Sequence, residues 1–396
     1  MKRIGIVVPR CHASLVGGAE AHAWQYATLL AGEYAVEVLT TTATDYVTWA
    51  NDLPERSERR EGVTIRRFRV ARERGGYFHD LHRRLLAHFD AGTGAAPDAR
   101  VRWTEALQEE FIRAQGPHSP GLIEHLATRG DDYAAVIFLT YLYPTTHDGV
   151  RALRHRRWGL VPTLHDEPPA YFGVVGALAR SAPRILWNTA AERALGRRLW
   201  GTDAGNLVAM TVATAPAPPV RQAVPYLLYS GRIDSHKGCA MLLEAFASWR
   251  RAHAAPLQLV LTGTDKLGIG NREGVRYEGF VDERRKLALM AGALAFVHPS
   301  PNESLSIVVL EAMAQGTPVI VNGDCAALEE HVLRSGSGFA FRGEEQLHAA
   351  IDTVRALDAD ARATQAARAR AYVLGGYGPE AVRARLFAEI EALAGN

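Results

Sequence analysis

The amino-acid sequence predicts an α/β protein with two doubly wound, Rossmann-like domains. Short apolar runs, typical of buried parallel strands, alternate with helical patterns along the chain. This alternation stops at the proline-rich stretch Val212–Pro225 and starts again after it. A length of 396 residues also suits two domains, at roughly 150 residues each. We therefore expect a first domain over residues 1–211, a linker over 212–225 and a second domain over 226–378.

The first domain opens with a strand, a glycine loop, a helix and a second strand. The first strand is predicted at Arg3–Pro9, the loop contains Gly17 and Gly18, and the helix runs over Ala19–Leu30. Further strands are predicted at Ala35–Thr40, Val63–Val70, Ala134–Thr140, Leu160–Leu164 and Arg184–Asn188. The stretch Gly75–Leu126 exceeds a simple connection, so we expect it to lie beside a site.

The second domain repeats the alternation of strands and helices. Its strands are predicted at Tyr226–Gly231, Gln258–Gly263, Val275–Gly279, Ala293–Val297, Pro318–Val321 and Gly338–Phe341. The last helix is predicted at Pro379–Leu393, with an apolar stripe at Val382, Leu386, Ile390 and Leu393.

The composition excludes several classes of protein. Hydrophobic residues make up 47% and charged residues 22%, which is ordinary for a globular chain. The net charge of +2 gives no electrostatic drive toward nucleic acid. The three cysteines are isolated, and no apolar run approaches the ~18 residues of a membrane span, so we expect a soluble cytoplasmic protein without a disulfide framework or zinc site. Lysine is rare, so a lysine in a candidate site is informative.

The most informative segment is HPSPNESLSIVVLEAMAQG, residues 298–316. Asn302 and Ser304 are residue types that cap helices, so we expect a helix to begin near Ser304–Ser306 and to present its N-terminus to an anion. Glu303 and Glu311 would lie about 10 Å apart along its axis. That span suits a nucleotide sugar, which has hydroxyls at both ends and negative charge between them. Alternatively, both glutamates decorate a helix surface.

A second cluster of charged residues lies in GRIDSHKG, residues 231–238, after a buried-type strand. Arg232 and Lys237 stand five residues apart in a loop that opens a helix. Two cations in such a loop can neutralise a diphosphate and stabilise it as a leaving group. The alternative is a solvated turn.

Several motifs of the chain resemble those of one enzyme family when they are taken in order. They are GGAE at 17–20, GRIDSHKG at 231–238, TG at 262–263, GFV at 279–281 and the two glutamates within ESLSIVVLEAMAQGTPVI. This set is similar to that of retaining, GT-B fold glycosyltransferases of family 4, in which the glutamate pair is an EX7E motif. The resemblance implies a nucleotide-sugar site on the second domain and an acceptor site on the first. It also implies that the final helix packs back on the first domain.

The resemblance also implies roles for individual residues. Arg232 and Lys237 would hold the diphosphate, approached by the backbone of Gly17 and Gly18. Glu303 would contact donor-sugar hydroxyls, and Glu311 the ribose. Gly263 would also belong to the donor site. The backbone of Phe280 and Val281 would line the base pocket, and amides near Ser304, Leu305 and Ser306 would cover the sugar and phosphate.

His165, at the end of a first-domain strand, matches the family histidine near the reacting centre. Its alternative is a structural role. Two departures from the family pattern matter. Ser304-Leu305-Ser306 stands where many members have Gly-Phe-Gly, so the identity of the sugar does not carry over. The segment Asn322–Cys325 replaces a commoner Gly-Gly turn, and Cys325 is interpreted as a packing residue.

Other residues are candidates for the acceptor side of the site. They are His118, Tyr141, Tyr143, Thr145 and His147, with ordinary loop packing as the alternative for each. Glu20 could also face the acceptor. The cationic run Arg151–Arg157 could touch an anionic lipid surface, but a solvated helix face is favoured. No Asp-x-Asp stands in a strand-end loop, so no metal ion is required.

The sequence thus predicts a retaining hexosyltransferase that moves a sugar from a nucleoside diphosphate to an acceptor hydroxyl. A UDP-sugar donor is favoured and a GDP-sugar is the next choice, with no other cofactor. The acceptor could be a glycan, a glycolipid or a small natural product. One rival is a nucleotide-sugar 2-epimerase on the same fold, and another is a non-catalytic nucleotide-sugar-binding protein. A dinucleotide oxidoreductase is disfavoured because the first loop lacks GxGxxG.

Overall fold

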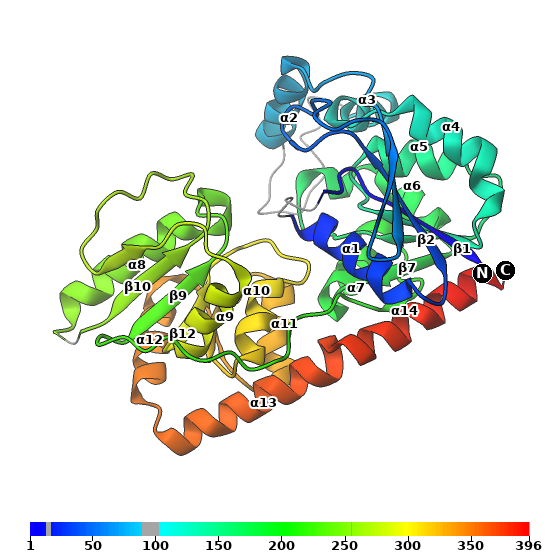
Figure 1. Ribbon diagram of the computed structural model, residues 1–396. Coiled ribbons are helices and arrows are strands. Elements are labelled where there is room, and N and C mark those ends of the chain that lie inside the picture. Colours follow the sequence, from blue (N-terminus) through cyan, green and yellow to red (C-terminus); the bar gives the residue numbers. More distant parts are fainter. Residues whose placement is uncertain (13–16, 89–102, 255, 396) are drawn as a thin grey trace. The chain divides into compact units, whose positions relative to one another are not determined.

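The computed structural model describes residues 1–12, 17–88, 103–254 and 256–395 (Figure 1). The chain forms two compact units. The first unit comprises Met1–Met210 together with Arg383–Asn396, and the second comprises Thr211–Val382. Each unit is built on its own Rossmann-like sheet, so the predicted α/β fold with two doubly wound sheets is confirmed.

The first unit is built on a sheet with the strand order β3-β4-β2-β1-β5-β6-β7-β8 among its described residues. Every neighbouring pair is parallel except β3 and β4. The strands are β1 (Arg3–Val7), β2 (Ala35–Thr41), β3 (Ser57–Arg60), β4 (Val63–Phe68), β5 (Ala135–Leu139), β6 (Trp158–Val161), β7 (Arg184–Trp187) and β8 (Asn206–Leu207). The central strands are apolar and buried because helices cover both faces of a doubly wound sheet.

Two strands of the first sheet were not predicted, and one prediction was displaced. β3 is the charged segment SERR on the sheet edge, and β8 has two residues, so neither carries an apolar run. The strand predicted at Leu160–Leu164 is Trp158–Val161 instead. It ends there because Pro162 has no backbone N–H and Thr163 takes a left-handed φ of 52°.

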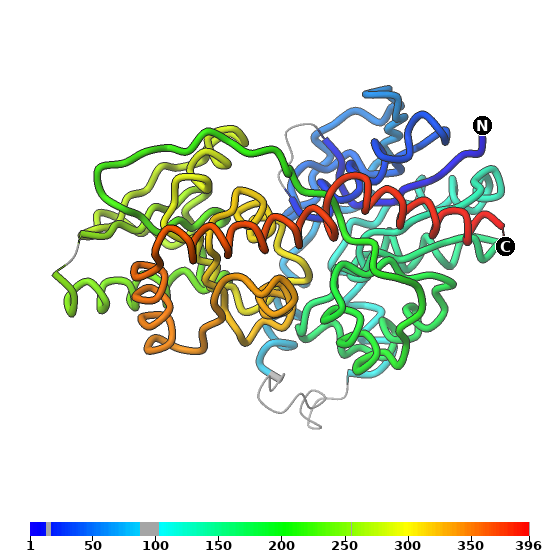
Figure 2. The backbone as a smooth tube through the Cα atoms, turned by 90° about the horizontal axis from the view of Figure 1, so that it is seen from below, coloured from blue at the N-terminus to red at the C-terminus, as the bar shows by residue number. Residues whose placement is uncertain are grey.

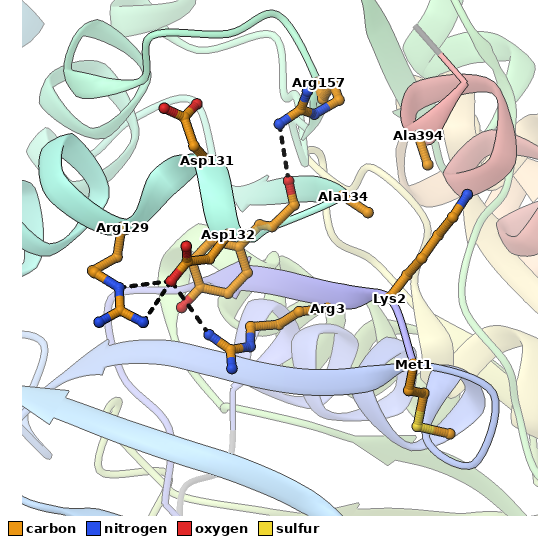
Figure 3. A pocket seen from close by; sticks show the side chains of 10 residues that line it. Met1, Lys2, Arg3, Arg129, Asp131, Asp132, Ala134, Arg157 and Ala394 are labelled. Atoms are coloured by element: carbon orange, nitrogen blue, oxygen red, sulfur yellow. Dashed lines mark hydrogen bonds and ion pairs between the residues drawn. The ribbon is translucent and has the colours of Figure 1, made fainter.

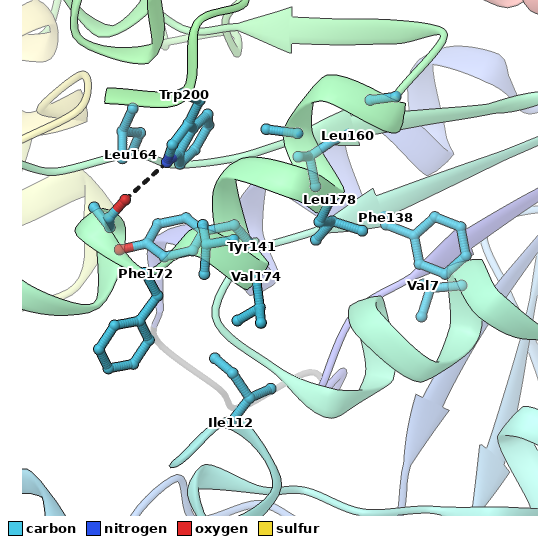
Figure 4. Close-up of a cluster of buried hydrophobic side chains, with 14 of the residues drawn as sticks. Val7, Ile112, Phe138, Tyr141, Leu160, Leu164, Phe172, Val174, Leu178 and Trp200 are labelled. Carbon is cyan, nitrogen blue, oxygen red and sulfur yellow. Dashed lines mark hydrogen bonds between the residues drawn. The ribbon is translucent and has the colours of Figure 1, made fainter. Parts of the chain in front are cut away.

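Helices of the first unit pack on its sheet around an aromatic core (Figure 4). Within this core the ring of Tyr141 lies 5.5 Å from that of Trp200, and the Trp200 indole donates a 2.8 Å hydrogen bond to the carbonyl of Ala170. The helices are α1 (Gly18–Leu30), α2 (Gly76–His88), α3 (Glu105–Gln115), α4 (Pro120–Arg129), α5 (Pro144–Ala152), α6 (Gly173–Ser181) and α7 (Ala190–Trp200). The predicted long insertion, Gly75–Leu126, contains α2, α3 and the start of α4, and its residues 89–102 lie outside the described residues.

The second unit has a sheet with the order β11-β10-β9-β12-β13-β14, parallel throughout its described residues. The strands are β9 (Tyr226–Ser230), β10 (Gln258–Thr262), β11 (Val275–Tyr277), β12 (Ala295–His298), β13 (Val319–Asn322) and β14 (Phe339–Phe341). The helices are α8 (Cys239–Ala252), α9 (Glu283–Gly292), α10 (Ile307–Ala314), α11 (Ala326–Ser335), α12 (Gly343–Ala356) and α13 (Ala359–Tyr377). Helix α8 contacts α12, whereas α10 contacts α9 and α13, so two separate groups of helices cover the sheet.

The C-terminal helix α14 (Pro379–Ala394) belongs to the first unit from Arg383 onward. There Arg383 pairs with Glu33, and the ring of Phe387 lies 5.5 Å from that of Tyr34. The buried side chains of Leu386, Ile390 and Leu393 form the apolar stripe of the helix. Both chain ends belong to this unit (Figure 2). Among the described residues, no helix is both long and apolar enough for a membrane span.

A groove of about 620 Å³ lies at the amino edge of the first sheet (Figure 3). Its walls include residues that precede β1, β5 and β6, together with Ala394 near the C-terminus. Asp132 pairs within the groove with Arg129 at 2.6 Å and with Arg3 at 3.6 Å. Ligands of parallel α/β sheets bind at the opposite, carboxyl edge. A ligand site is therefore expected at the carboxyl edge of each sheet.

Candidate functional site

Three strand-end loops meet at the carboxyl edge of the second sheet. The backbone N–H of Gly231, after β9, donates to the Thr262 carbonyl at 3.0 Å. The N–H of Gly263, after β10, donates to the carbonyl of Gly279 at 2.8 Å. Gly263 has a φ of +121°, and a Cβ there would lie 1.9 Å from the Gly231 carbonyl oxygen. Only glycine fits this approach. Gly231, Gly263 and Gly279 therefore lie side by side. Arg232 follows the first of these glycines and Phe280 follows the last, so the structure brings these predicted donor-site segments together.

Glu303 lies at the centre of this edge, between two nitrogen donors. Its Oε1 is 2.6 Å from the Lys237 Nζ and 3.0 Å from the His298 Nε2. Lys237 comes from the loop after β9, whereas His298 is the last residue of β12 and is 3% exposed. The β9 and β12 loops also touch directly, because a Cβ on Gly238 would lie 2.4 Å from the Pro299 carbonyl oxygen. Lys237 and Glu303, which were predicted separately as donor-site residues, are therefore neighbours in space.

The surroundings of Glu303 keep its carboxylate ionised. Burial by itself would raise the pKa of Glu303, but the hydrogen bond and charge of His298 and those of Lys237 outweigh it. The net effect holds the pKa of Glu303 well below the ordinary value of a carboxyl group. A buried, charged acceptor of this kind can take hydrogen bonds from the hydroxyls of a ligand.

Arg232 and Lys237 each pair with a carboxylate of the second unit. The Arg232 Nε lies 2.5 Å from Asp234 Oδ2, and the Arg232 side chain is 45% exposed. Asp234 also caps the short turn Ser235–Lys237 by accepting the N–H of Lys237 at 2.8 Å. The loop after β9 is therefore fixed by its own aspartate. An ammonium group has three N–H donors, so Lys237 can contact Glu303 and an anion together.

Helix α10 begins at Ile307, one residue beyond the predicted start range, and its N-cap is Ser306. Asn302 and Ser304, the predicted capping residues, precede that position. Ser306 has a left-handed φ of 65°, and its side chain makes no capping hydrogen bond. The first N–H groups of the helix are therefore not satisfied by the N-cap side chain.

Glu311, on α10, is paired with Lys286 of α9. The Lys286 Nζ lies 2.7 Å from Glu311 Oε2 and 2.8 Å from Glu283 Oε2. Burial raises the pKa of Glu311, while the charge of Lys286 opposes that change. Glu311 is 5% exposed, so it does not decorate a helix surface. By contrast, the Phe280 ring, beside the predicted base pocket, is 70% exposed.

The carboxyl edge of the first sheet carries the remaining predicted residues. Gly17 is the N-cap of α1, and Gly18 is its first residue. The Glu20 carboxylate lies so close to Gly17 that a Cβ there would meet it, and the same carboxylate pairs with Arg10. Glu20 is thus committed to an ion pair beside the glycine loop, where a carboxylate also suits the first turn of a helix.

His165 lies in a loop held by two buried or half-buried acids. Its Nδ1 is 3.8 Å from Glu167 Oε1, which accepts the Tyr141 hydroxyl at 2.6 Å. The fully buried Glu192 accepts the backbone N–H groups of Leu164 and Asn188, both at 2.6 Å. It thereby ties the end of β6 to the end of β7. Burial raises the pKa of Glu192 to about 8, because these hydrogen bonds offset only part of the desolvation.

Three of the five residues predicted on the acceptor side are buried. Tyr141, Thr145 and His147 are between 1% and 5% exposed, which is what the packing alternative expects. Tyr141 belongs to the aromatic core, and His147 Nε2 contacts the Tyr141 carbonyl at 2.8 Å. These residues follow a buried strand directly, and the chain turns back into the core there. His118 stays half exposed, 3.7 Å from Asp148, and Tyr143 packs edge-on against Trp49.

The cationic run Arg151–Arg157 is partly engaged within the first unit. Arg151 pairs with Glu109 at 2.6 Å, and Arg157 donates to the carbonyl of Tyr133 at 3.4 Å. Within the described ranges, no group of three or more His, Cys, Asp or Glu side chains is placed to hold a metal ion.

Three residues of these two edges were not assigned roles from the sequence. His298 contacts Glu303, and Lys286 contacts Glu311. Glu192 accepts the N–H of Leu164 and so holds the loop that contains His165. His298 ends a buried parallel strand, which is a position where ligand-site residues gather, so this signal was present. Lys286 belongs to the rare lysines, which was a second signal. Glu192 follows Thr189 by three residues and resembles an ordinary helix start.

The comparison with known families finds a match in the second unit. Residues 215–371 match the family model of the glycosyl transferases group 1. Among curated proteins, the glycogen synthase of Mycobacterium tuberculosis is 34% identical over 153 residues, which is 36% of this chain and 36% of that protein. The match spans about a third of that relative, and it does not extend to the whole protein.

Solved structures match nearly the whole chain. Sucrose-phosphate synthase from Thermosynechococcus elongatus aligns with a TM-score of 0.71 at 20% identity, over 99% of both chains. The Anabaena protein HepE, solved in complex with UDP and glucose, aligns with a TM-score of 0.69 at 15% identity, over 99% of this chain and 100% of that one. At these identities the likeness concerns the fold, which is of the GT-B type, as predicted.

Proposed function

We propose that this protein is a retaining glycosyltransferase of family 4 that transfers a hexosyl group from a nucleoside diphosphate sugar to an acceptor hydroxyl. The observation that carries the proposal is the ionised Glu303, held by Lys237 and His298 beside the N-terminus of α10. The carboxylate of Glu303, the cations Arg232 and Lys237 and the N-terminus of α10 all lie within residues 215–371, the segment that matches the glycosyl transferases group 1.

The roles of the second-unit residues follow from their chemistry. Arg232 and Lys237 bind the diphosphate and stabilise the charge that develops as it leaves. Glu303 accepts hydrogen bonds from donor-sugar hydroxyls, and Glu311 accepts them from the ribose. Lys286 pairs with Glu311 and opposes the rise of its pKa that burial causes. Phe280 and Val281 flank the base. UDP is the favoured nucleotide, and the solved complex of HepE with UDP supports this choice.

The reaction proceeds on one face of the sugar. The bond from the anomeric carbon to the diphosphate oxygen breaks, and the bond to the acceptor oxygen forms. The acceptor hydroxyl gives its proton to the leaving diphosphate oxygen, so the configuration is retained without a protein nucleophile. Glu303 binds sugar hydroxyls instead of attacking the anomeric carbon. His165, held by the loop that Glu192 anchors, serves the reacting centre from the first unit, which also binds the acceptor.

The test is a donor-and-acceptor screen on the full chain. UDP-glucose and GDP-mannose are incubated with a panel of glycans, glycolipids and small hydroxylated natural products, and released nucleotide is measured. We expect release only with a matching acceptor, and proton NMR of the product to show the donor's anomeric configuration. An inverted product would refute retention.

Two other outcomes would point to the rival functions. Conversion of the donor to its 2-epimer without any acceptor would identify an epimerase. Tight nucleotide binding without turnover across the whole panel would identify a binding protein.

A further inference from the structure

The backbone at Ser306 has a conformation that serine adopts at a cost. Its φ is 65° and its ψ is 83°, in the left-handed region, which glycine enters without a steric penalty. Strained residues of this kind persist where the surroundings hold them, and they gather at ligand sites. A serine kept at such a position calls for a role of its side chain.

The Ser306 hydroxyl has no hydrogen-bond partner among the residues that the structure describes. The residue is 7% exposed, and its Oγ is buried. A serine at an N-cap normally has extended backbone and accepts an N–H of the first helical turn. The left-handed φ of Ser306 prevents this capping hydrogen bond. The hydroxyl therefore makes no hydrogen bond to the first amides of α10. Buried hydroxyls are almost always hydrogen-bonded. The partner of the Ser306 hydroxyl is therefore expected to be a group that does not belong to the protein chain.

The carbonyl group of Leu305, in the peptide that joins Leu305 to Ser306, is held by a buried histidine. The Leu305 carbonyl accepts a 2.6 Å hydrogen bond from Nε2 of His331, a fully buried residue of α11. The other ring nitrogen of His331 is held at 2.9 Å by the hydroxyl of Tyr372, on α13. A trans peptide directs its C=O and N–H in opposite directions. The N–H of Ser306 therefore points away from His331, and the peptide cannot turn over without breaking that hydrogen bond.

We propose that the Ser306 hydroxyl, together with the first amides of α10, binds a phosphate oxygen of the nucleoside diphosphate, so that Ser306 is a donor-binding residue through its side chain. This assignment rests on the proposed function. A hydroxyl and several N–H groups at the positive end of a helix are all donors, and a phosphate oxygen is an acceptor that satisfies them together. Lys237, which pairs with the neighbouring Glu303, adds a positive charge to this edge.

The experiment compares Ser306→Gly and Ser306→Ala with the unchanged chain. Dissociation constants for UDP, GDP, UDP-glucose and GDP-mannose are measured by calorimetry, and melting temperatures are measured without ligand. Both variants should bind the diphosphate about tenfold more weakly, the effect of one lost hydrogen bond to a charged group. Ser306→Gly also relieves the left-handed strain, so its melting temperature should be unchanged or higher. A merely structural hydroxyl would lower the melting temperature and leave nucleotide binding alone.

The matched control is Glu61→Gly, because Glu61 is a second non-glycine residue with positive φ, at 50°, on an exposed turn of the first unit. It should leave every dissociation constant unchanged.

Each other outcome overturns the assignment in a recognisable way. Weaker binding of the nucleotide sugars with unchanged binding of UDP and GDP would place the hydroxyl on the sugar. Weak binding by Ser306→Gly but not Ser306→Ala would indicate loop flexibility in place of a hydrogen bond. If the unchanged chain binds none of the four nucleotides, the proposed function itself fails.

Discussion

Two buried glutamates, one in each unit, show how surroundings set the task of the same side chain. Glu192 is fully buried and accepts two backbone N–H groups, which do not outweigh its desolvation, so burial raises its pKa to about 8. Glu303 is also buried, but Lys237 and His298 contact it and hold its pKa well below the ordinary value. The first carboxyl group ties two strand ends together. The second remains charged and available to a ligand.

The two glutamates give opposite pH dependence. The raised pKa of Glu192 means that its contribution to stability is fully present below the ordinary carboxyl pKa and is lost as the pH rises through about 8. The lowered pKa of Glu303 means that its contribution is present above the ordinary value and is lost only as the pH falls through its depressed pKa. Acid and alkali therefore weaken different units.

The largest effect on the rate of transfer is expected when the charge of Glu303 is removed. Glu303→Gln keeps the shape of the side chain but removes the charge, so the rate of transfer should fall at least about 100-fold. Affinity for UDP or GDP should change by less than about threefold, because the sugar contact is lost and the diphosphate contacts remain. Steady-state kinetics and calorimetry measure the two. Wild-type turnover in this variant would remove Glu303 from the donor site.

The next effect concerns the cations of the second unit. The double variant Arg232→Ala, Lys237→Ala loses two charge-assisted contacts to the diphosphate, so nucleotide affinity should fall about 100-fold. Glu303 also loses Lys237, which should raise the pKa of that carboxyl toward its ordinary value. Arg251→Ala, an exposed arginine on α8, serves as the control and should bind UDP or GDP normally. Equal affinity in the double variant and the control would refute the role of these cations.

A third test concerns the raised pKa of the buried Glu192 and its effect on stability. Glu192→Gln cannot ionise, so the cost of ionising a buried carboxyl at alkaline pH disappears. Between pH 5 and pH 9 the variant should gain stability relative to the unchanged chain by an amount on the order of a few kcal/mol. Melting temperatures across this range measure the change. Parallel curves for the two proteins would show that Glu192 keeps an ordinary pKa.

The smallest effect is expected at His298. His298→Gln weakens one hydrogen bond to Glu303 while Lys237 stays in place, so the rate of transfer should fall about tenfold. The acid limb of the pH profile of kcat should also move to higher pH, because the pKa of Glu303 is less depressed. An unchanged acid limb would mean that Lys237 alone sets the charge of Glu303.

The sequence by itself determined the order of the elements. Apolar runs and helical periods are local patterns, so they located the central strands, the helix over 379–394 and the segment with Glu303 and Glu311. Strand β3 was not predicted because a charged edge strand is stabilised by its pairing with β4, which no local pattern records.

Only the tertiary structure decided which side chains meet. Glu303 pairs with Lys237 across 66 residues, Glu192 reaches Leu164 across 28, and His331 anchors Leu305 across 26. The burial of Tyr141 was decided in the same way, by the packing of Trp200 against its ring. Such contacts depend on how parallel strands align their carboxyl ends and on how helices pack over them. The residues that carry the chemistry could therefore be named from the sequence, but their charge states and partners could not.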